Sequence, residues 1–316
     1  MHMMKAVRIH SFGGPEVLAY EDVPRPQPAE GEVLVHVAAS GVNPVDWKIR
    51  EGFGRHFLKF SLPLILGWDF SGVVEELGPH VRRLKIGDEV YSRPDISRNG
   101  SYAEYIVVRE SEVARKPASI DHLHAAAVPL AALTAWQGLF DDAKLASGQT
   151  VLIHGAAGGV GHFAAQLAAW KGARVIGTAS TRNQDFLRTL GCAEAIDYNH
   201  GRFEDLVHHA DLVLDTVGGE TVDRSWRVLK PGGILVSVVP GNPSAETAAA
   251  HGVRCAHTVV RPSAAQLDEL TKLIDSGVLK IHLDAILPLH RAAEAQELNK
   301  KGHTRGKIVL QISGTP

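Results

Sequence analysis

The chain has 316 residues, a length that accommodates two domains of ordinary size. Hydrophobic residues make up 45% of it and charged residues 22%, a balance typical of soluble globular proteins. The formal net charge of −2 provides no basic surface for nucleic acid, and no apolar run reaches the roughly 20 residues of a membrane helix, so we expect binding to neither nucleic acid nor membranes.

The first third of the chain is predicted to be a β domain. Its N-terminus leads directly into a strand pattern, so no signal peptide is expected. Pro24, Pro26 and Pro28 indicate an extended edge segment. Many short strands separated by turns are typical of a partly open β-barrel. The strands expected from apolar alternation are residues 5–10, 33–37, 69–77, 88–92 and 102–108.

The hydrophobic pattern changes near residue 120. Residues 120–140 are alanine-rich with helical spacing, and after Val151 strands alternate with helices. This alternation predicts a doubly wound parallel sheet. The expected strands are residues 151–154, 174–178, 195–197, 211–215, 233–238 and 253–259, with helices at 163–170, 182–190 and 221–229.

The tail of the chain has a mixed pattern, with two helices at 264–276 and 290–299 and a closing strand at 307–312. We expect this late strand to pair with the first domain, which makes that domain discontinuous. The predicted domains are residues 1–121 together with 263–316, and a nucleotide-binding domain at 122–262.

The most informative motif is the glycine-rich turn between the strand at 151–154 and the following helix. In that context the phosphates of a dinucleotide bind to backbone N–H groups at the helix N-terminus. Ala156 replaces the first glycine of the usual G-x-G-x-x-G pattern, and a purely structural turn is the alternative. A side chain at Gly158 or Gly159 would block the phosphates, whereas Gly161 lets the helix pack closely on the strand. The residues expected to bind the cofactor here are Gly155, Ala157, Gly158, Gly159, Val160 and Gly161.

The residues after the second strand of this domain predict NADP(H) rather than NAD(H). An NAD site normally carries an acidic residue about 20 residues after the glycines, but none occurs from Ala156 to Gln184. Ser180, Thr181 and Arg182 can instead hydrogen-bond and neutralise a 2′-phosphate. The alternative is an exposed helix start that Ser180 or Thr181 caps.

Cysteine and histidine usage gives no indication of a metal site. The two cysteines, Cys192 and Cys255, are far apart, which suits a reducing cytoplasm and excludes a four-cysteine zinc site. The histidine pairs at 122/124 and 208/209 lack the i, i+4 spacing of a helical zinc site. We therefore expect a cytoplasmic protein without a bound metal.

Four segments together resemble the medium-chain dehydrogenase/reductase superfamily, and more closely its zinc-independent NADPH:quinone oxidoreductase branch. The resemblance extends over essentially the whole chain. It implies a GroES-like β-barrel catalytic domain, a Rossmann domain with a doubly wound parallel sheet, and NADPH held between them. The segments are residues 40–48 (SGVNPVDWK), 66–74 (LGWDFSGVV), 81–91 (VRRLKIGDEVY) and 156–161 (AAGGVG).

Zinc-dependent relatives carry a Cys in the first of these segments and Gly-His-Glu in the second. Asn43 and Trp68 stand at the matching positions and offer neither a thiolate nor an imidazole. Without a metal, the easiest hydride acceptors are already electrophilic. The sequence therefore predicts hydride transfer from NADPH to a small-molecule quinone or α,β-unsaturated carbonyl, with the protein providing orientation. No residue stands out as a general acid.

Asn43 is the first candidate for a catalytic residue, because its amide can donate to a substrate carbonyl or to the nicotinamide carboxamide. A turn residue before Pro44 is the alternative. Asp46 is expected to cap the helix that follows. Phe53, near where relatives often carry a tyrosine, and Trp68 form an apolar wall of the active site or pack in the core.

The resemblance implies further cofactor contacts. Thr134 is expected beside the nicotinamide, with a helix-interior role as the alternative, and Tyr198 on the adenosine phosphate. Lys307 reaches the cofactor or is a solvated charge. Strand ends at the cofactor edge of the sheet are expected to add Val217, Val238 and Val239.

Two other functions stay open. One is an enoyl-thioester or 2-alkenal reductase on the same fold, and the other is an NADPH-binding protein with a sensing or structural role. The resemblance also implies a homodimer. The last strand of the nucleotide sheet, within residues 253–260, is expected at a sheet edge that needs covering or pairing.

Overall fold

The computed structural model describes residues 2–55, 61–241 and 243–313, which fold into two compact units. None of the helices in these ranges is long and apolar enough to cross a membrane. The first unit comprises Met1–Leu130, Arg261–Gly277 and Ile281–Pro316, and the second comprises Ala131–Val260 and Val278–Lys280.

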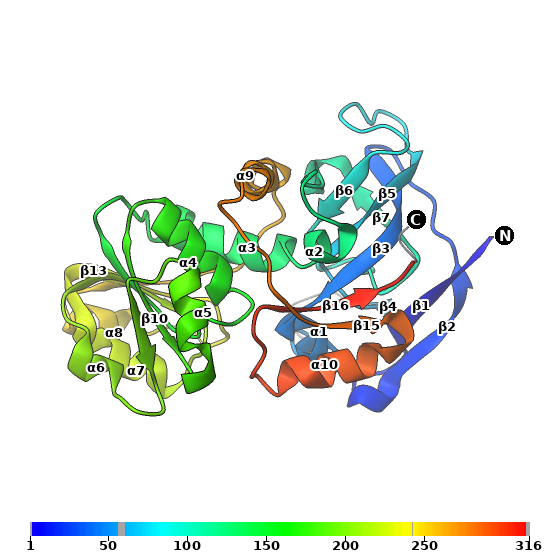
Figure 1. Cartoon of the computed structure of the whole chain (residues 1–316). Helices are drawn as coiled ribbons and strands as arrows, with labels where there is room; N and C mark the ends of the chain where they lie inside the picture. Colours follow the sequence, from blue (N-terminus) through cyan, green and yellow to red (C-terminus); the bar gives the residue numbers. More distant parts are fainter. Residues whose placement is uncertain (1, 56–60, 242, 314–316) are drawn as a thin grey trace. The chain divides into compact units, whose positions relative to one another are not determined.

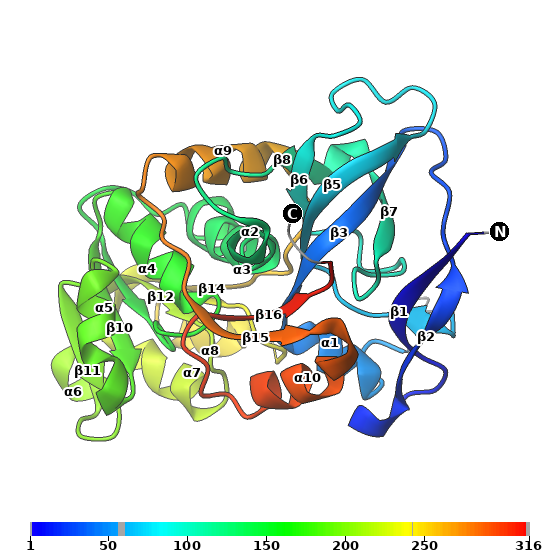
Figure 2. The same ribbon diagram turned by 45° about the vertical axis from the view of Figure 1, so that its right-hand side comes forward.

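The first unit is built on a seven-stranded sheet in which strands from the first third of the chain pair with strands near its C-terminus (Figures 1 and 2). Its strands are β3 (Glu32–Val42), β5 (Phe70–Leu77), β6 (Glu89–Ser92), β7 (Tyr105–Arg109), β8 (Val113–Arg115), β15 (Leu283–Pro288) and β16 (Lys307–Gln311). They lie in the order β15-β16-β3-β5-β6-β8, and β7 also pairs with β3.

The long strand β3 organises this sheet. The alternating residues Val33, Val35 and Val37 are buried together with Phe70 and Ile106 in one apolar cluster. The C-terminal part of β3 pairs antiparallel with β16. The expected pairing of the closing strand with the N-terminal part of the chain is therefore confirmed.

The described part of the first unit also contains a three-stranded sheet in the order β2-β1-β4 and four α-helices. These elements are β1 (Met3–Ile9), β2 (Leu18–Pro24), β4 (Leu64–Ile65), α1 (Pro44–Arg50), α2 (His122–Ala126), α9 (Ala264–Asp275) and α10 (Ala292–Lys300). Helices α1 and α10 lie side by side in both views (Figures 1 and 2). The buried Arg50 side chain joins them, because it donates to Gln296 Oε1 at 3.0 Å and pairs with Glu297 at 3.0 Å.

The sequence pattern does not predict β2, β8 or β15 as strands. All three lie at the edges of their sheets. In β2 and β15 few side chains pack against the core, so the apolar alternation is weak, whereas β8 has only 3 residues, too few to show an alternation. In β2, for example, Val23 is the one fully buried residue, although the strand pairs with β1 along its whole length.

The second unit is a six-stranded sheet in which every adjacent pair is parallel. Its strands are β9 (Thr150–Ile153), β10 (Arg174–Ala179), β11 (Glu194–Asp197), β12 (Ala210–Asp215), β13 (Leu229–Ser237) and β14 (Arg254–His257). They lie in the order β11-β10-β9-β12-β13-β14, which confirms the predicted doubly wound sheet. The strand order reverses between β9 and β12, where ligands bind in such sheets.

Helices cover both faces of this sheet, and Figure 1 shows α4 and α5 on one side and α8 on the other. The helices are α4 (Gly161–Trp170), α5 (Gln184–Thr189), α6 (Phe203–Leu206), α7 (Glu220–Ser225) and α8 (Ala245–Ala250).

The segment over residues 120–140 is helical, as its pattern predicts, but it is divided into separate helices. The segment forms α2, then α3 (Pro129–Trp136), then a π-helical turn at Gln137–Asp142. Pro129 has no N–H to continue a helix and disfavours helical backbone at Val128, so a new helix begins there.

Gly161 marks the closest approach between α4 and the turn after β9. A Cβ at this position would lie 2.2 Å from the carbonyl oxygen of Gly155 and 2.7 Å from the Cα of Ala156. Both neighbours are backbone atoms that cannot rotate away. A Cβ at Gly158 would meet only the Gly155 oxygen, at 3.3 Å. The expected close packing at Gly161 is therefore confirmed.

We expect Gly161→Ala to lower the free energy of unfolding by about 1–3 kcal/mol, because the added methyl group forces the helix away from the turn. Gly158→Ala is the matched control in the same turn and should have a clearly smaller effect. Urea unfolding without cofactor measures both. Equal losses for the two variants would contradict the packing argument.

Candidate functional site

The turn after β9 in the second unit presents backbone donors at the N-terminus of a ten-residue helix. The N–H groups of Gly155 and Ala156 donate to Thr178, and that of Gly158 to the Gly155 carbonyl. Within the described ranges, four other N–H groups in the turn have no intramolecular acceptor. Free N–H groups at a helix start are what the pyrophosphate of a dinucleotide requires, so the turn fits this group. The four belong to Ala157, Gly159, Val160 and Gly161.

Asp215 organises the ends of β12 and β13. Its buried carboxylate accepts hydrogen bonds from the N–H groups of Val217 (3.1 Å) and Gly218 (2.9 Å), and from the Ser237 hydroxyl (2.9 Å). The Val238 N–H donates to the backbone carbonyl of Asp215 at 3.0 Å, so the predicted residues Val217 and Val238 both bond to Asp215. Val239 follows and donates to the Ser237 hydroxyl at 3.4 Å.

The predicted 2′-phosphate residues lie in a short turn after β10. Thr181 and Arg182 are exposed and Ser180 is half-buried. Ser180 stands at the N-cap position of this turn, but its side chain makes no capping bond and instead accepts from Asn183 at 3.2 Å. The alternative that Ser180 caps the following helix with its side chain is therefore wrong.

An acidic residue that sequence reasoning missed lies beside this turn. Asp197 ends the neighbouring strand β11, and its hydrogen bond from the Thr181 hydroxyl holds its pKa at about 2. His200 also contacts it at 2.9 Å. Tyr198 is half-exposed, and its N–H donates to the Ala179 carbonyl at 3.3 Å, which places it beside the end of β10. The residues that directly follow β10 in the sequence do not include Asp197. It lies beside them because β11 pairs with β10.

The first unit contains a connected group of buried polar side chains, which we call the Asn43 network. Its members are 0–3% exposed and come from the end of β3, the start of α1, the residue before β5, the segment before β7 and the first residue of β16. They are Asn43, Asp46, Asp69, Tyr102 and Lys307.

Lys307 lies inside this network. Its ammonium group donates to the side-chain oxygen of Asn43, lies 3.3 Å from the Val42 carbonyl oxygen, and pairs with Asp69 Oδ2 at 3.4 Å. The side chain is 3% exposed, so the alternative of a solvated charge is wrong. Contact between Lys307 and the cofactor stays a prediction.

Asn43 uses both ends of its amide. Its Oδ1 accepts from Lys307, and its Nδ2 donates to Asp69 Oδ2 at 3.0 Å. Its backbone N–H donates to Asp46 Oδ2 at 2.8 Å. Asn43 is thus the N-cap of α1, and Asp46 caps the helix start from the third helical position, within the helix and not before it. Tyr102 also donates to Asp46 Oδ2, at 2.9 Å.

Asp69 is fully buried and was not singled out by sequence reasoning. Its Oδ1 accepts from the Leu130 N–H at 2.9 Å. A Cβ at Gly41 would lie 2.8 Å from Asp69 Oδ2, so the absence of a side chain on β3 makes room for the carboxylate. The available signal was an ionisable residue between the apolar residues Trp68 and Phe70.

The remaining predicted site residues lie in different surroundings. Trp68 has no exposed surface, belongs to the core, and donates its indole N–H to the Arg98 carbonyl at 3.1 Å. This position favours the core-packing alternative. Phe53 is 42% exposed in the turn after α1. Thr134 is buried within α3, so its contact with nicotinamide stays a prediction.

The side chains at the zinc-ligand positions do not fit a catalytic zinc. The Asn43 oxygen already accepts from an ammonium group, and the indole of Trp68 has only a donor. Across residues 2–55, 61–241 and 243–313, no three His, Cys, Asp or Glu side chains cluster in a way that suits a metal.

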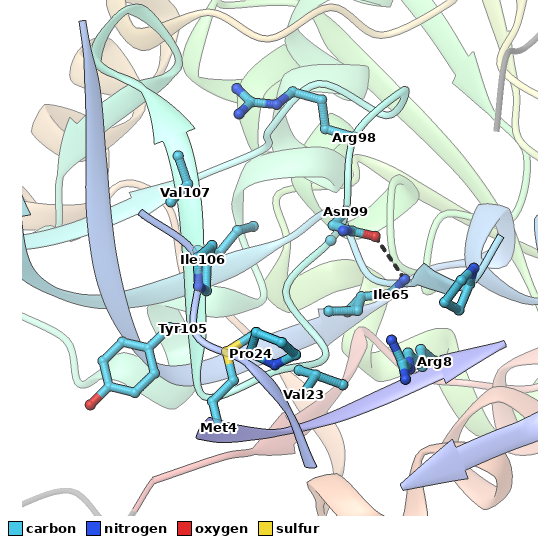
Figure 3. A pocket seen from close by; sticks show the side chains of 13 residues that line it. Met4, Arg8, Val23, Pro24, Ile65, Arg98, Asn99, Tyr105, Ile106 and Val107 are labelled. Carbon is cyan, nitrogen blue, oxygen red and sulfur yellow. Dashed lines mark hydrogen bonds between the residues drawn. The ribbon is translucent and has the colours of Figure 1, made fainter. Parts of the chain in front are cut away.

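A separate cavity of about 310 Å³ lies in the first unit beside β1 and β7 (Figure 3). Its wall combines apolar side chains such as Met4, Val23 and Ile106 with polar groups. The two arginines that line it are paired within the chain, Arg8 with Glu21 and Arg98 with Glu32. None of the predicted site residues lines this cavity.

Comparison with known proteins gives one family model for the N-terminal part of the chain and another for the C-terminal part. The model of the alcohol dehydrogenase GroES-like domain matches residues 29–118, and that of zinc-binding dehydrogenases matches residues 190–310. The chain is 32% identical to a chloroplast envelope quinone oxidoreductase homolog of Arabidopsis thaliana, over 98% of both chains. The chain belongs to the quinone oxidoreductase branch of the medium-chain dehydrogenase/reductase superfamily.

Two further relatives support this assignment. An NADPH-dependent alkenal/one oxidoreductase of Arabidopsis thaliana chloroplasts is 35% identical over 97% of this chain and 79% of its own length. The solved structure of a quinone oxidoreductase from Coxiella burnetii has a TM-score of 0.91 and 37% identity, covering 99% of this chain and all of its own. The predicted fold, a GroES-like domain with a Rossmann sheet, is confirmed.

Burial raises the pKa of Asp46 to about 7, although hydrogen bonds from Asn43 and Tyr102 oppose this. The folded chain therefore binds this proton more tightly than the unfolded chain, whose carboxyl has a pKa of about 4. Linkage then requires this group's contribution to the free energy of unfolding to fall as pH rises from about 4 to about 7, and to stay level above that.

We expect Asp46→Asn to remove this component. The variant should gain stability relative to the wild type as pH rises through that window, by at most about 1.4 kcal/mol per pH unit. Urea unfolding of both proteins between pH 4.5 and 8 measures the difference. A difference that does not vary with pH would contradict the assigned titration.

Proposed function

We propose that this chain is an NADPH-dependent reductase that transfers a hydride to quinones or α,β-unsaturated carbonyls without zinc. The observation that carries the proposal is the Lys307–Asn43 contact at a zinc-ligand position of the family. A site whose first ligand position is engaged by an ammonium group does not polarise an unactivated carbonyl through zinc. Its substrates must therefore be electrophilic by conjugation.

In this proposal the nicotinamide supplies the hydride when it is bound. The free N–H groups after β9 hold the pyrophosphate, and Thr134 lies beside the nicotinamide. Asn43 donates its remaining amide N–H to the substrate carbonyl, and Phe53 contributes apolar surface. Conjugation spreads the negative charge of the product over an enolate or phenolate, so solvent can deliver the final proton.

The proposed preference for NADPH rests on Ser180, Thr181, Arg182 and Tyr198 around the end of β10. Basic and hydroxyl groups bind a phosphate well. Asp197 opposes it, because its charge lies next to Thr181. We therefore infer a preference for NADPH over NADH that is real but moderate.

Steady-state kinetics over a panel of acceptors tests the function. We expect NADPH oxidation with quinones and with open-chain enones, no oxidation of simple alcohols, and rates that a zinc chelator leaves unchanged. Zinc-dependent alcohol oxidation would overturn the proposal. Stable NADPH binding without turnover of any conjugated acceptor would favour a sensing or structural role instead.

The same panel separates the second candidate, an enoyl-thioester or 2-alkenal reductase. The similarity to an alkenal/one oxidoreductase supports this candidate. If alkenals or crotonyl thioesters give kcat/KM values well above those of quinones, the narrower name applies to this chain.

Arg182→Ala tests the proposed phosphate contact. We expect the KM for NADPH to rise roughly tenfold and the KM for NADH to stay within twofold, because only NADPH presents the charge that Arg182 would bind. Arg188→Ala is the matched control, since Arg188 lies on the following helix and pairs with Asp185 at 2.5 Å. Equal effects of Arg182→Ala on both cofactors would exclude a 2′-phosphate contact.

We also infer the assembly and the cellular location of the chain. We infer a homodimer, which is supported by the place of β14 at the edge of the sheet and by the exposure of Val259 beyond it. A cytoplasmic location without binding to nucleic acid or membranes is supported by the two free cysteines and by the net charge of −2.

A further inference from the structure

We propose that Lys307 is a positioning residue that fixes the orientation of the Asn43 amide, so that an N–H and not the carbonyl oxygen is offered to the reacting carbonyl. The inference rests on the proposed function, in which Asn43 contacts the substrate. It assigns Lys307 to the substrate side of the chemistry rather than to the cofactor.

The contacts define a short chain of three groups. The Lys307 ammonium donates to Asn43 Oδ1, and Asn43 Nδ2 donates to Asp69 Oδ2 at 3.0 Å. The ammonium also lies 3.4 Å from the same Asp69 oxygen, so the amide spans an ion pair. All three residues are at most 3% exposed, and electrostatic contacts are stronger in such buried surroundings than in water.

The chemistry of the two charged groups allows only one amide orientation. An ammonium group has donors and no acceptor, and a carboxylate has acceptors and no donor. A flipped amide would place its NH₂ against Lys307 and its oxygen against Asp69, and both contacts would be repulsive. Asn43 therefore cannot exchange its two ends while the ion pair is intact.

This arrangement leaves one donor on Asn43. An amide nitrogen carries two hydrogens, and Asp69 accepts one of them. The ammonium at Oδ1 withdraws electron density from the amide, which strengthens the remaining N–H as a donor. A preorganised donor aimed at the oxygen that gains charge is a recognised source of rate acceleration.

The backbone supports the same geometry. The carbonyl of Val42 lies 3.3 Å from the Lys307 ammonium, and the Asn43 N–H is held by Asp46 at 2.8 Å. Lys307 is the first residue of β16, which pairs with β3 just before Asn43. The pairing of β16 with β3 therefore places the Lys307 ammonium group next to the Asn43 amide.

A simpler role for Lys307 would be to neutralise the buried charge of Asp69. Three variants separate the two roles. Lys307→Met removes the cation, and Lys307→Met with Asp69→Asn removes both charges. Lys116→Met is the matched control, because Lys116 is also buried in the first unit and pairs with Glu89 at 3.3 Å, outside the Asn43 network.

We expect Lys307→Met to lose both stability and kcat. In the double variant the urea midpoint should recover toward the wild-type value, because no unpaired buried charge remains. Its kcat should stay about 10–100-fold low, since the Asn43 amide is no longer oriented. The Kd for NADPH, from its fluorescence, should stay within twofold in both variants. Lys116→Met should lose stability at unchanged kcat.

Two results would overturn the proposal. Recovery of kcat together with stability in the double variant would make Lys307 a counter-ion only. A large rise in the Kd for NADPH with little change in kcat at saturation would make it a cofactor contact.

A spectroscopic readout keeps this test separate from the proposed function. The side-chain NH₂ signals of Asn43 can be assigned by their loss in Asn43→Asp in ¹⁵N-labelled protein without cofactor. We expect them to shift clearly in Lys307→Met and to stay in place in Lys116→Met. If the wild type reduces no acceptor, the proposed function fails, and unshifted Asn43 signals in Lys307→Met would refute the orientation independently.

Discussion

The buried charge of Asp69 is the constraint on which the first unit depends. A carboxylate with no exposed surface needs a cation and hydrogen-bond donors, and removing one partner of such a pair costs about 3–5 kcal/mol in other proteins. The donors come from Asn43 and Leu130, but the cation comes from Lys307, far along the chain. The closing strand is therefore tied to β3 by charge as well as by backbone pairing. The same contacts hold the residue that we place against the substrate.

In the second unit the main constraint is that the turns at one edge of the sheet stay open for a ligand. Parallel strands deliver their carboxyl ends to one side of the sheet, and the turns beyond them must stay open for a ligand. Asp215 closes the turn after β12 by accepting from its backbone and from Ser237 on β13. The turn after β9 leaves its donors free because they lie at a helix start, and Gly161 lets the helix pack closely against the turn. Rigid packing and unfilled donors thus coexist within a few residues.

Local signals predicted much of this arrangement. The glycine turn, the parallel strands of the second unit and the capping role of Asp46 follow from residue type and spacing over a few positions. Edge strands such as β2 and β15 were missed because their side chains are only partly buried and carry no clear alternation. Asp197 was missed because it reaches Thr181 through sheet pairing and not through its place in the chain. The helical pattern over residues 120–140 is confirmed, but the pattern alone did not show that Pro129 divides it into separate helices.

The sequence by itself determined the family, the nucleotide-binding turn and the replacement of zinc ligands by Asn43 and Trp68. Each of these can be recognised from a short contiguous segment of the chain. Only the tertiary structure decided what surrounds those residues. It placed Trp68 in the core, and it showed that Lys307 is a buried partner of Asn43 and Asp69 rather than a solvated charge. The physical reason is that burial and charge pairing depend on which distant segments meet. No spacing along the chain specifies that residue 307 lies against residue 43.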